Sequence, residues 1–236
     1  MKTIILFIVV LFTPTLYAES FESYGVLPFL SLSKGINNKF DLSFYHSDTF
    51  STREKTFHGK KYPSRDLQAY FQTAINYKFL PNINLSLGHI YQRNNPVDVD
   101  FVNEHRIFEQ ATFSHSRDAF QFTHRIRFEQ RFIDEREEHE FKTRLRYQIG
   151  FNVPLDGRQL DPGEWYFNTY NEFYFSTTGE RNAFFSDDWL YAGFGYQTID
   201  WGKLEVGPIA QYGMINRDKD IRAFYALQFG WILKFK

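Results

Sequence analysis

The sequence predicts an all-β fold: a single transmembrane antiparallel β-barrel of about 10–12 strands, preceded by a cleaved signal peptide. Three observations support this prediction. Long segments alternate between apolar and polar residues, aromatic residues are abundant although mean hydropathy is negative, and the chain begins with a short apolar run. A soluble β-sandwich is the alternative fold, and it would be recovered without detergent.

The alternation is clearest in residues 119–132, which form two sets when read in steps of two. The even set is mostly apolar: Phe120, Phe122, His124, Ile126, Phe128, Gln130 and Phe132. The odd set is polar and contains three arginines: Gln121, Thr123, Arg125, Arg127, Glu129 and Arg131. A period of two indicates a strand, and one of 14 residues exceeds the usual length of about five or six. Residues 140–153 repeat the pattern, as expected for barrel strands with a lipid-facing exterior and a charged interior.

Composition agrees with this fold and excludes several others. Phe and Tyr number 28 and 15, yet mean hydropathy is -0.45. Lipid-facing aromatic residues combined with lumen-facing polar residues account for both values. The chain has no cysteine, which excludes a disulfide framework. Its net charge of -1 and the lack of a basic block argue against nucleic-acid binding.

The N-terminus reads as a secretory signal peptide. Met1-Lys2 precedes the apolar run Ile4–Phe12, and Ala18 offers a cleavage site before Glu19. The apolar run is too short to be a membrane helix, and no later stretch approaches the ~18 apolar residues that one requires. We therefore expect residues 1–18 to be removed and residues 19–236 to form one outer-membrane barrel domain in a Gram-negative-type envelope.

Eleven segments along the mature chain alternate like strands. They are 24–33, 39–47, 67–79, 84–93, 104–114, 119–132, 140–153, 165–175, 188–197, 203–214 and 221–235. Because bacterial single-chain barrels have an even number of strands, we expect 10 or 12, with one strand missed within 48–66 or one divided wrongly. Connections after alternate strands are long, including 48–66, as in barrels with short turns at one end and long loops at the other.

Five segments together resemble a known family. They are SLSKGINNKFDLSF (31–44), HRIRFEQRF (124–132), RLRYQIGFNVPL (144–155), YNEFYF (170–175) and LYAGFGYQ (190–197). In this order they resemble the uncharacterised outer-membrane barrels catalogued as domain of unknown function 2490. Trp189 departs from the resemblance, which leads us to expect an arginine there. The resemblance implies a barrel fold and an outer-membrane location, and it implies no activity.

The candidate site is a charge network in the lumen. Its predicted members face inward: Arg125, Arg127, Glu129, Arg131, Arg144, Arg146, Glu172 and Glu205. Residues 119–132 and 140–153 are hairpin neighbours, so their arginines must lie close together. One interpretation is a positively biased lumen that binds or passes a small anionic solute. The other is an ion-pair network that fills a narrow barrel and serves structure alone.

A lipid hydrolase is the remaining alternative, resting on Ser114-His115-Ser116 beside His124. Adjacent strand residues face opposite sides, so His115 is poorly placed to activate either serine, and we predict no catalytic residue. The other histidines (His46, His58, His89, His105 and His139) lack metal-ligand spacing, so we predict no metal and no cofactor.

The expected surroundings are outer-membrane lipid, both phospholipid and lipopolysaccharide. Aromatic residues near strand ends fit interfacial girdles: Trp165, Trp201, Tyr212 and Trp231. The acidic tip 134–140 is expected to be a solvated loop. The preferred function is a small channel or solute-interacting barrel, and the main alternative is a closed structural or docking barrel that acts through its extracellular loops. The oligomeric state and the solute are open.

Overall fold

The computed structural model describes residues 20–57, 59–94, 101–135, 138–178, 184–214 and 221–235. The predicted signal peptide, 1–18, lies outside these residues, as does the centre of the acidic tip 134–140. Within the described ranges the chain forms thirteen strands. No helix in this part of the chain is long and apolar enough to cross a membrane.

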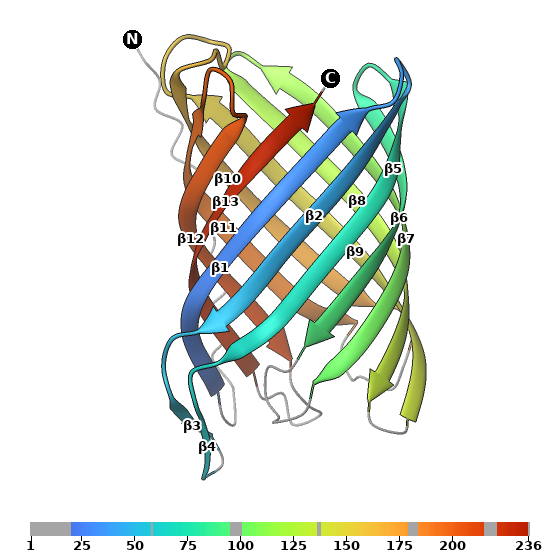
Figure 1. The fold of residues 1–236 in the computed structure, drawn as a ribbon, viewed down its shortest axis with the longest axis vertical. Helices are drawn as coiled ribbons and strands as arrows, with labels where there is room; N and C mark the ends of the chain where they lie inside the picture. Colours follow the sequence, from blue (N-terminus) through green and yellow to red (C-terminus); the bar gives the residue numbers. More distant parts are fainter. Residues whose placement is uncertain are drawn as a thin grey trace.

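Eleven of the strands close into one barrel, which Figure 1 shows as a tilted, continuous wall. In chain order these strands are β1 (Ser20–Gly35), β2 (Phe40–Ser51), β5 (Asp66–Leu80), β6 (Ile83–Asn94), β7 (Val102–Arg117), β8 (Phe120–Glu135), β9 (Glu138–Pro154), β10 (Glu164–Ser176), β11 (Phe185–Gln197), β12 (Lys203–Met214) and β13 (Ile221–Phe235). Each corresponds to one of the eleven segments predicted from alternation. The all-β barrel prediction is thereby confirmed.

The barrel has an odd number of strands, so the expectation of 10 or 12 was wrong. Segment 48–66 does contain two further strands, β3 (Lys55–Phe57) and β4 (Lys60–Tyr62), but they form a separate hairpin beyond the barrel wall. An odd count makes the closing pair parallel: β1 pairs with β13 from Ser20 opposite Ile221 to Lys34 opposite Phe235. The barrel is therefore not antiparallel throughout, and the start of β1 and the end of β13 lie at opposite mouths.

Connections differ between the two mouths (Figure 1). At one mouth lie the turns 36–39, 81–82 and 118–119, together with 155–163 and 198–202; we call this the short-turn mouth. In the first turn, the side chain of Asn37 accepts hydrogen bonds from the amides of Lys39 and Phe40, which holds the chain in a tight reversal. The β3–β4 hairpin extends from the other mouth, which we call the long-loop mouth.

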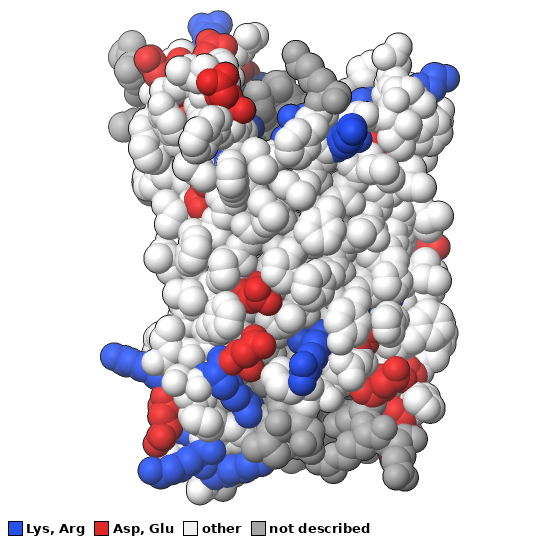
Figure 2. Space-filling model, in the orientation of Figure 1, with Lys and Arg blue, Asp and Glu red and all other residues white. Residues whose placement is uncertain are grey.

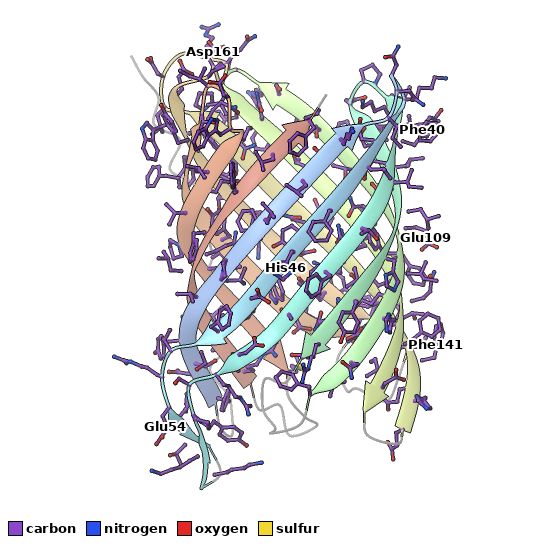
Figure 3. All side chains as sticks on the ribbon, viewed as in Figure 1. Phe40, His46, Glu54, Glu109, Phe141 and Asp161 are labelled. Atoms are coloured by element: carbon purple, nitrogen blue, oxygen red, sulfur yellow. The ribbon has the colours of Figure 1, made fainter. Side chains whose placement is uncertain are left out.

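The outer face of the barrel is mostly apolar. Figure 3 shows Phe40 and Phe141 pointing away from the wall, and their exposed fractions are 38% and 58%. In the view of Figure 2, most charged side chains gather toward the two ends and few lie between them. Such a surface would be an aggregation liability in water.

The lumen is filled with side chains, and its two halves differ. Toward β1 and β11–β13 it holds an apolar cluster that includes Leu27, Tyr191 and Phe224. Toward β7–β10 it holds charged side chains, described below. The wall of β11 carries glycines where rings lie flat against it: a Cβ on Gly195 would collide with the ring of Tyr166. The inward Gly-x-Gly pattern of this strand is thus explained by tyrosines that lie across its surface.

Candidate functional site: an arginine–glutamate network in the lumen

The site is built on the hairpin of β8 and β9. Their register places Arg127 opposite Arg146 and Glu129 opposite Arg144, all at inward positions. The network that extends from this hairpin is here called the arginine network. Among the residues that the structure describes, it contains six arginines and three glutamates: Arg106, Arg125, Arg127, Arg131, Arg144, Arg146, Glu104, Glu129 and Glu172. Every member is joined to another by an N–O distance of 4.0 Å or less.

Glu129 is the centre of the arginine network and has no exposed surface. Its Oε2 accepts hydrogen bonds from Nε and Nη2 of Arg144, at 2.9 and 2.6 Å. Its Oε1 accepts one from Nη1 of Arg146 at 2.8 Å. Arg106 and Arg127 lie farther away, each with a nitrogen 3.8 Å from a carboxylate oxygen. The carboxylate is buried and compensated by several guanidinium groups, which is the condition under which a buried charge is tolerated.

Glu172 extends the arginine network toward the short-turn mouth. Its Oε1 accepts hydrogen bonds from Nη2 of Arg125 at 2.6 Å and from Nε of Arg146 at 2.8 Å. The hydroxyl of Tyr174 donates to its Oε2 and accepts from Arg146. Arg125 is the most exposed of these groups, at 24% of its side chain, and its Nε has no hydrogen-bond partner within the described residues.

Glu104 extends the network toward the long-loop mouth. Arg106 donates to both of its carboxylate oxygens, at 2.6 and 3.0 Å, and Arg131 donates to the same two oxygens at 2.5 and 3.0 Å. Glu104 and Arg106 were not among the predicted site residues, because they lie on β7, outside the hairpin of residues 119–153. The alternation of β7, in which both occupy even positions, was the signal that would have found them.

Positive charge exceeds negative charge within the arginine network by three formal units. Arg127 shows the consequence most clearly. It is 3% exposed, and its hydrogen bonds of normal length go to the amide oxygens of Gln110 and Gln72 rather than to carboxylates. Its guanidinium also lies over the ring of Phe108, 4.1 Å from the centroid. Neutral partners solvate this cation without neutralising it.

Glu205 was predicted to belong to this site, and the structure places it elsewhere. It lies on β12, where its Oε1 accepts a hydrogen bond from the hydroxyl of Tyr166 at 2.6 Å. The strands β10 and β11 lie between β12 and β9, so its inward face looks onto the tyrosine-rich part of the lumen. Trp189, the departure from the family pattern, packs against Tyr174 with ring centroids 5.1 Å apart. A ring thus stands where an arginine was expected.

The histidines considered for hydrolysis lie on the outer face. His115 and His124 stack at 5.4 Å between centroids, and Nδ1 of His124 lies 2.9 Å from the hydroxyl of Tyr147. Ser114 and Ser116 occupy the alternate positions of β7, as expected from the alternation. Of the residues that the structure describes, no three His, Cys, Asp or Glu form a group able to hold a metal ion.

Exposed tryptophans gather near the short-turn mouth. Trp165 begins β10 and is 53% exposed, Trp201 lies in the connection 198–202 and is 68% exposed, and Trp231 lies near the end of β13. The indole N–H of Trp231 donates to the carbonyl of Trp201. Rings with an apolar body and a polar N–H at one level of a barrel are typical of an aromatic girdle.

Comparison with protein families gives one match: the family described as "Protein of unknown function (DUF2490)", over residues 29–222. The chain belongs to this family. The match begins within β1 and ends at the start of β13, so it includes the whole of β2 to β12 of this closed barrel. Comparisons with curated proteins and with solved structures gave no match.

Proposed function

We propose that this DUF2490 chain is an outer-membrane β-barrel whose lumen is a narrow, anion-selective path, with Arg125 and Arg127 as its binding groups. The observation that carries the proposal is the excess of six arginines over three glutamates in one buried network. An excess of buried positive charge is costly unless an anion enters to neutralise it.

Several features support the membrane location. The N-terminal segment reads as a signal peptide, the outer face is mostly apolar, and three exposed tryptophans lie near one mouth. A closed barrel satisfies its backbone hydrogen bonds strand to strand, which is what a bilayer requires of a spanning protein without helices. Phospholipid and lipopolysaccharide are then its immediate surroundings.

The arginines form a row rather than a point. Arg125, Arg127 and Arg131 share the inward face of β8, and Arg144 and Arg146 lie beside them on β9. At ~3.4 Å per strand residue, the row from Arg125 to Arg131 covers roughly 20 Å along the strand. With a tilt of ~35–45° this is about 15 Å along the barrel axis, more than half of the ~25 Å apolar band of such barrels. A small anion can move from one guanidinium group to the next along this row, where it competes with the glutamate carboxylates for the arginine N–H donors. The packing of the network keeps the path narrow.

Arg125 and Arg127 are the members best placed to take an anion. Arg125 is partly exposed, and within the described residues its Nε has no hydrogen-bond partner. The carboxylate of Glu129 lies 3.8 Å from Nη1 of Arg127, beyond hydrogen-bond distance. Guanidinium groups bind phosphate-like anions through paired N–H donors, so an anion with several oxygens suits the pair.

The second candidate is a closed structural barrel, and the complete burial of Glu129 favours it. The two functions can be distinguished by isothermal titration calorimetry, in which inorganic phosphate is titrated into the refolded mature chain in detergent. The proposal predicts saturable binding that weakens at least tenfold in Arg127→Gln and in Arg125→Gln. Lys78→Gln is the matched control, because Lys78 is a lumenal cation already paired with Asp41 at 2.9 Å. No binding to the folded wild-type barrel, or equal loss in the control, would contradict the proposal.

A further inference from the structure

The outer face of β6–β8 carries a polar patch midway between the two mouths. It consists of His89 on β6, His105 and Glu109 on β7, and Gln130 on β8, all arranged around Ile107. The register places His89 and Gln130 on either side of Ile107, in one row across the three strands. Figure 3 shows Glu109 pointing outward at the middle of the wall. We call these four residues with Ile107 the mid-wall patch.

Apolar side chains flank the carboxylate of the mid-wall patch. Leu87 and Phe128 flank Glu109 in its row and are 58% and 37% exposed, and Ile107 is 44% exposed. Within the patch, Nε2 of His89 lies 3.2 Å from Nδ1 of His105. The amide of Gln130 donates to both oxygens of Glu109, at 3.2 Å.

These contacts leave hydrogen-bonding capacity unused. A carboxylate accepts about four hydrogen bonds, and the described partner of Glu109 is one amide group. An ionisable side chain at the depth of the hydrocarbon core generally pairs with another protein group, because lipid offers none. The mid-wall patch therefore needs a partner that supplies donors opposite Glu109 and acceptors opposite the histidines.

A second copy of the same chain supplies this pattern. The strands are tilted relative to the barrel axis (Figure 1). Glu109, which is nearer the short-turn mouth than Ile107, is therefore displaced toward the β8 side. His105, which is nearer the long-loop mouth, is displaced toward the β6 side. The histidines thus lie on one side of Ile107, and the carboxylate and amide lie on the other. Consider a two-fold axis that passes through Ile107 and runs parallel to the barrel axis. It brings the histidine side of one copy against the carboxylate and amide side of the other.

We propose that the mid-wall patch is the interface of a two-fold dimer within the membrane, in which His89 of each copy faces Glu109 of the other and His105 faces Gln130. The charge pattern is self-complementary, which is what an isologous interface requires. The inference rests on the proposed membrane location and is independent of anion binding in the lumen. Loss of phosphate binding would leave it standing.

The first test exploits the symmetry of the contact. In the bilayer, the dimer fraction of fluorescently labelled chains is counted by single-molecule photobleaching, with heat-modifiable gel mobility confirming that each variant folds. His89→Glu places two carboxylates opposite each other, and Glu109→Lys replaces the carboxylate that faces His89 with a cation that cannot accept a hydrogen bond. Each change alone should weaken dimerisation at least tenfold. A dimer of one copy with His89→Glu and one copy with Glu109→Lys should form again. In it, the introduced glutamate faces the introduced lysine, and the native His89 of the second copy faces the native Glu109 of the first. Asp188→Ala, which alters a different outward carboxylate paired with Asn171, is the control and should leave the dimer unchanged.

The second test uses the absence of cysteine from the chain. Ile107→Cys lies on the proposed axis and should form a disulfide-linked dimer under mild oxidation in membranes, while Leu227→Cys on β13, also outward and exposed, should not. A wild-type chain that is monomeric in the bilayer, single variants that dimerise normally, or a mixture that fails to restore the dimer would each overturn the proposal. Equal cross-linking at Leu227→Cys would do the same.

Discussion

Glu129 and Arg144 face each other across the β8–β9 hairpin, with Oε2 of the glutamate 2.6 Å from Nη2 of the arginine and no exposed surface on Glu129. This contact joins the two strands inside the lumen at a place where the outer face is apolar. It also anchors the arginine network, since Arg146 shares the same carboxylate. The stability of the barrel and the proposed anion binding therefore depend on the same side chains.

Removing Glu129 should destabilise the barrel strongly. Glu129→Gln leaves the arginines without their central carboxylate, and breaking a buried ion pair in this way costs about 3–5 kcal/mol. The free energy of unfolding, measured by urea titration of the detergent-folded chain, should fall by that amount. Glu140→Gln is the control: Glu140 pairs with Lys142 near the strand end, is exposed, and should change stability by less than about 1 kcal/mol. Equal losses in both variants would show that burial of Glu129 is not the cause.

Gly195 should not tolerate a side chain. A Cβ at this position would overlap the ring of Tyr166, so Gly195→Ala forces the ring away from Glu205, to which its hydroxyl donates. Overpacking of this kind costs about 1–3 kcal/mol. Gly35→Ala serves as the comparison, because the nearest atom to its added Cβ is Asp41 Oδ1 at 3.5 Å, an ordinary contact. Unfolding in urea distinguishes the two, and an unaffected Gly195→Ala would contradict the packing described for this wall.

The odd strand count, together with the proposed membrane location, predicts that the two ends of the barrel domain lie on opposite sides of the membrane. An epitope placed directly before Ser20 should share its accessibility with a label on Lys61→Cys in the β3–β4 hairpin. An epitope after Phe235 should share the accessibility of Asn38→Cys in the turn 36–39. Labelling of intact cells with an impermeant maleimide and an epitope antibody measures all four. Both epitopes on one side would indicate an even-stranded barrel.

The four tryptophans should report two environments. Trp189 lies in the lumen against Tyr174, whereas Trp165 is exposed near the short-turn mouth. In bilayers of brominated lipid, a chain that retains Trp165 alone should lose most of its fluorescence, and one that retains Trp189 alone should lose little. The other tryptophans are replaced by Phe in each. Equal quenching would mean that the face assigned as interior contacts lipid, and no quenching in either would argue against membrane insertion.

The sequence was sufficient to predict the faces of the strands but insufficient to predict their neighbours. Alternation alone places Arg127 inward and Phe128 outward, because the period of two holds along each strand. Alternation does not determine the register between strands. The contact between His89 and His105 and the ion pair between Glu104 and Arg131 therefore could not be predicted. Glu205 was misassigned for the same reason: an inward position says nothing about which part of the lumen a side chain reaches.

The strand count shows a second limit. The alternation indicates all eleven barrel strands. The expectation of 10 or 12 strands came from the even strand number of bacterial single-chain barrels and not from the pattern itself. Closure depends on whether β1 can pair with β13, and the apolar outer faces of Val26–Leu32 and Leu227–Leu233 suit parallel and antiparallel pairing equally. Local pattern therefore carries no information about the direction of the closing pair.

The most direct test of the proposed anion path is the current through single barrels of the refolded mature chain in a planar bilayer, with a salt gradient across it. We expect small, steady current steps with a reversal potential that shows anion selectivity. Added phosphate should block the current, and Arg125→Gln combined with Arg127→Gln should reduce the selectivity. A barrel that inserts, folds and stays silent, or one that selects cations, would contradict it. The arginine network would then be a structural plug.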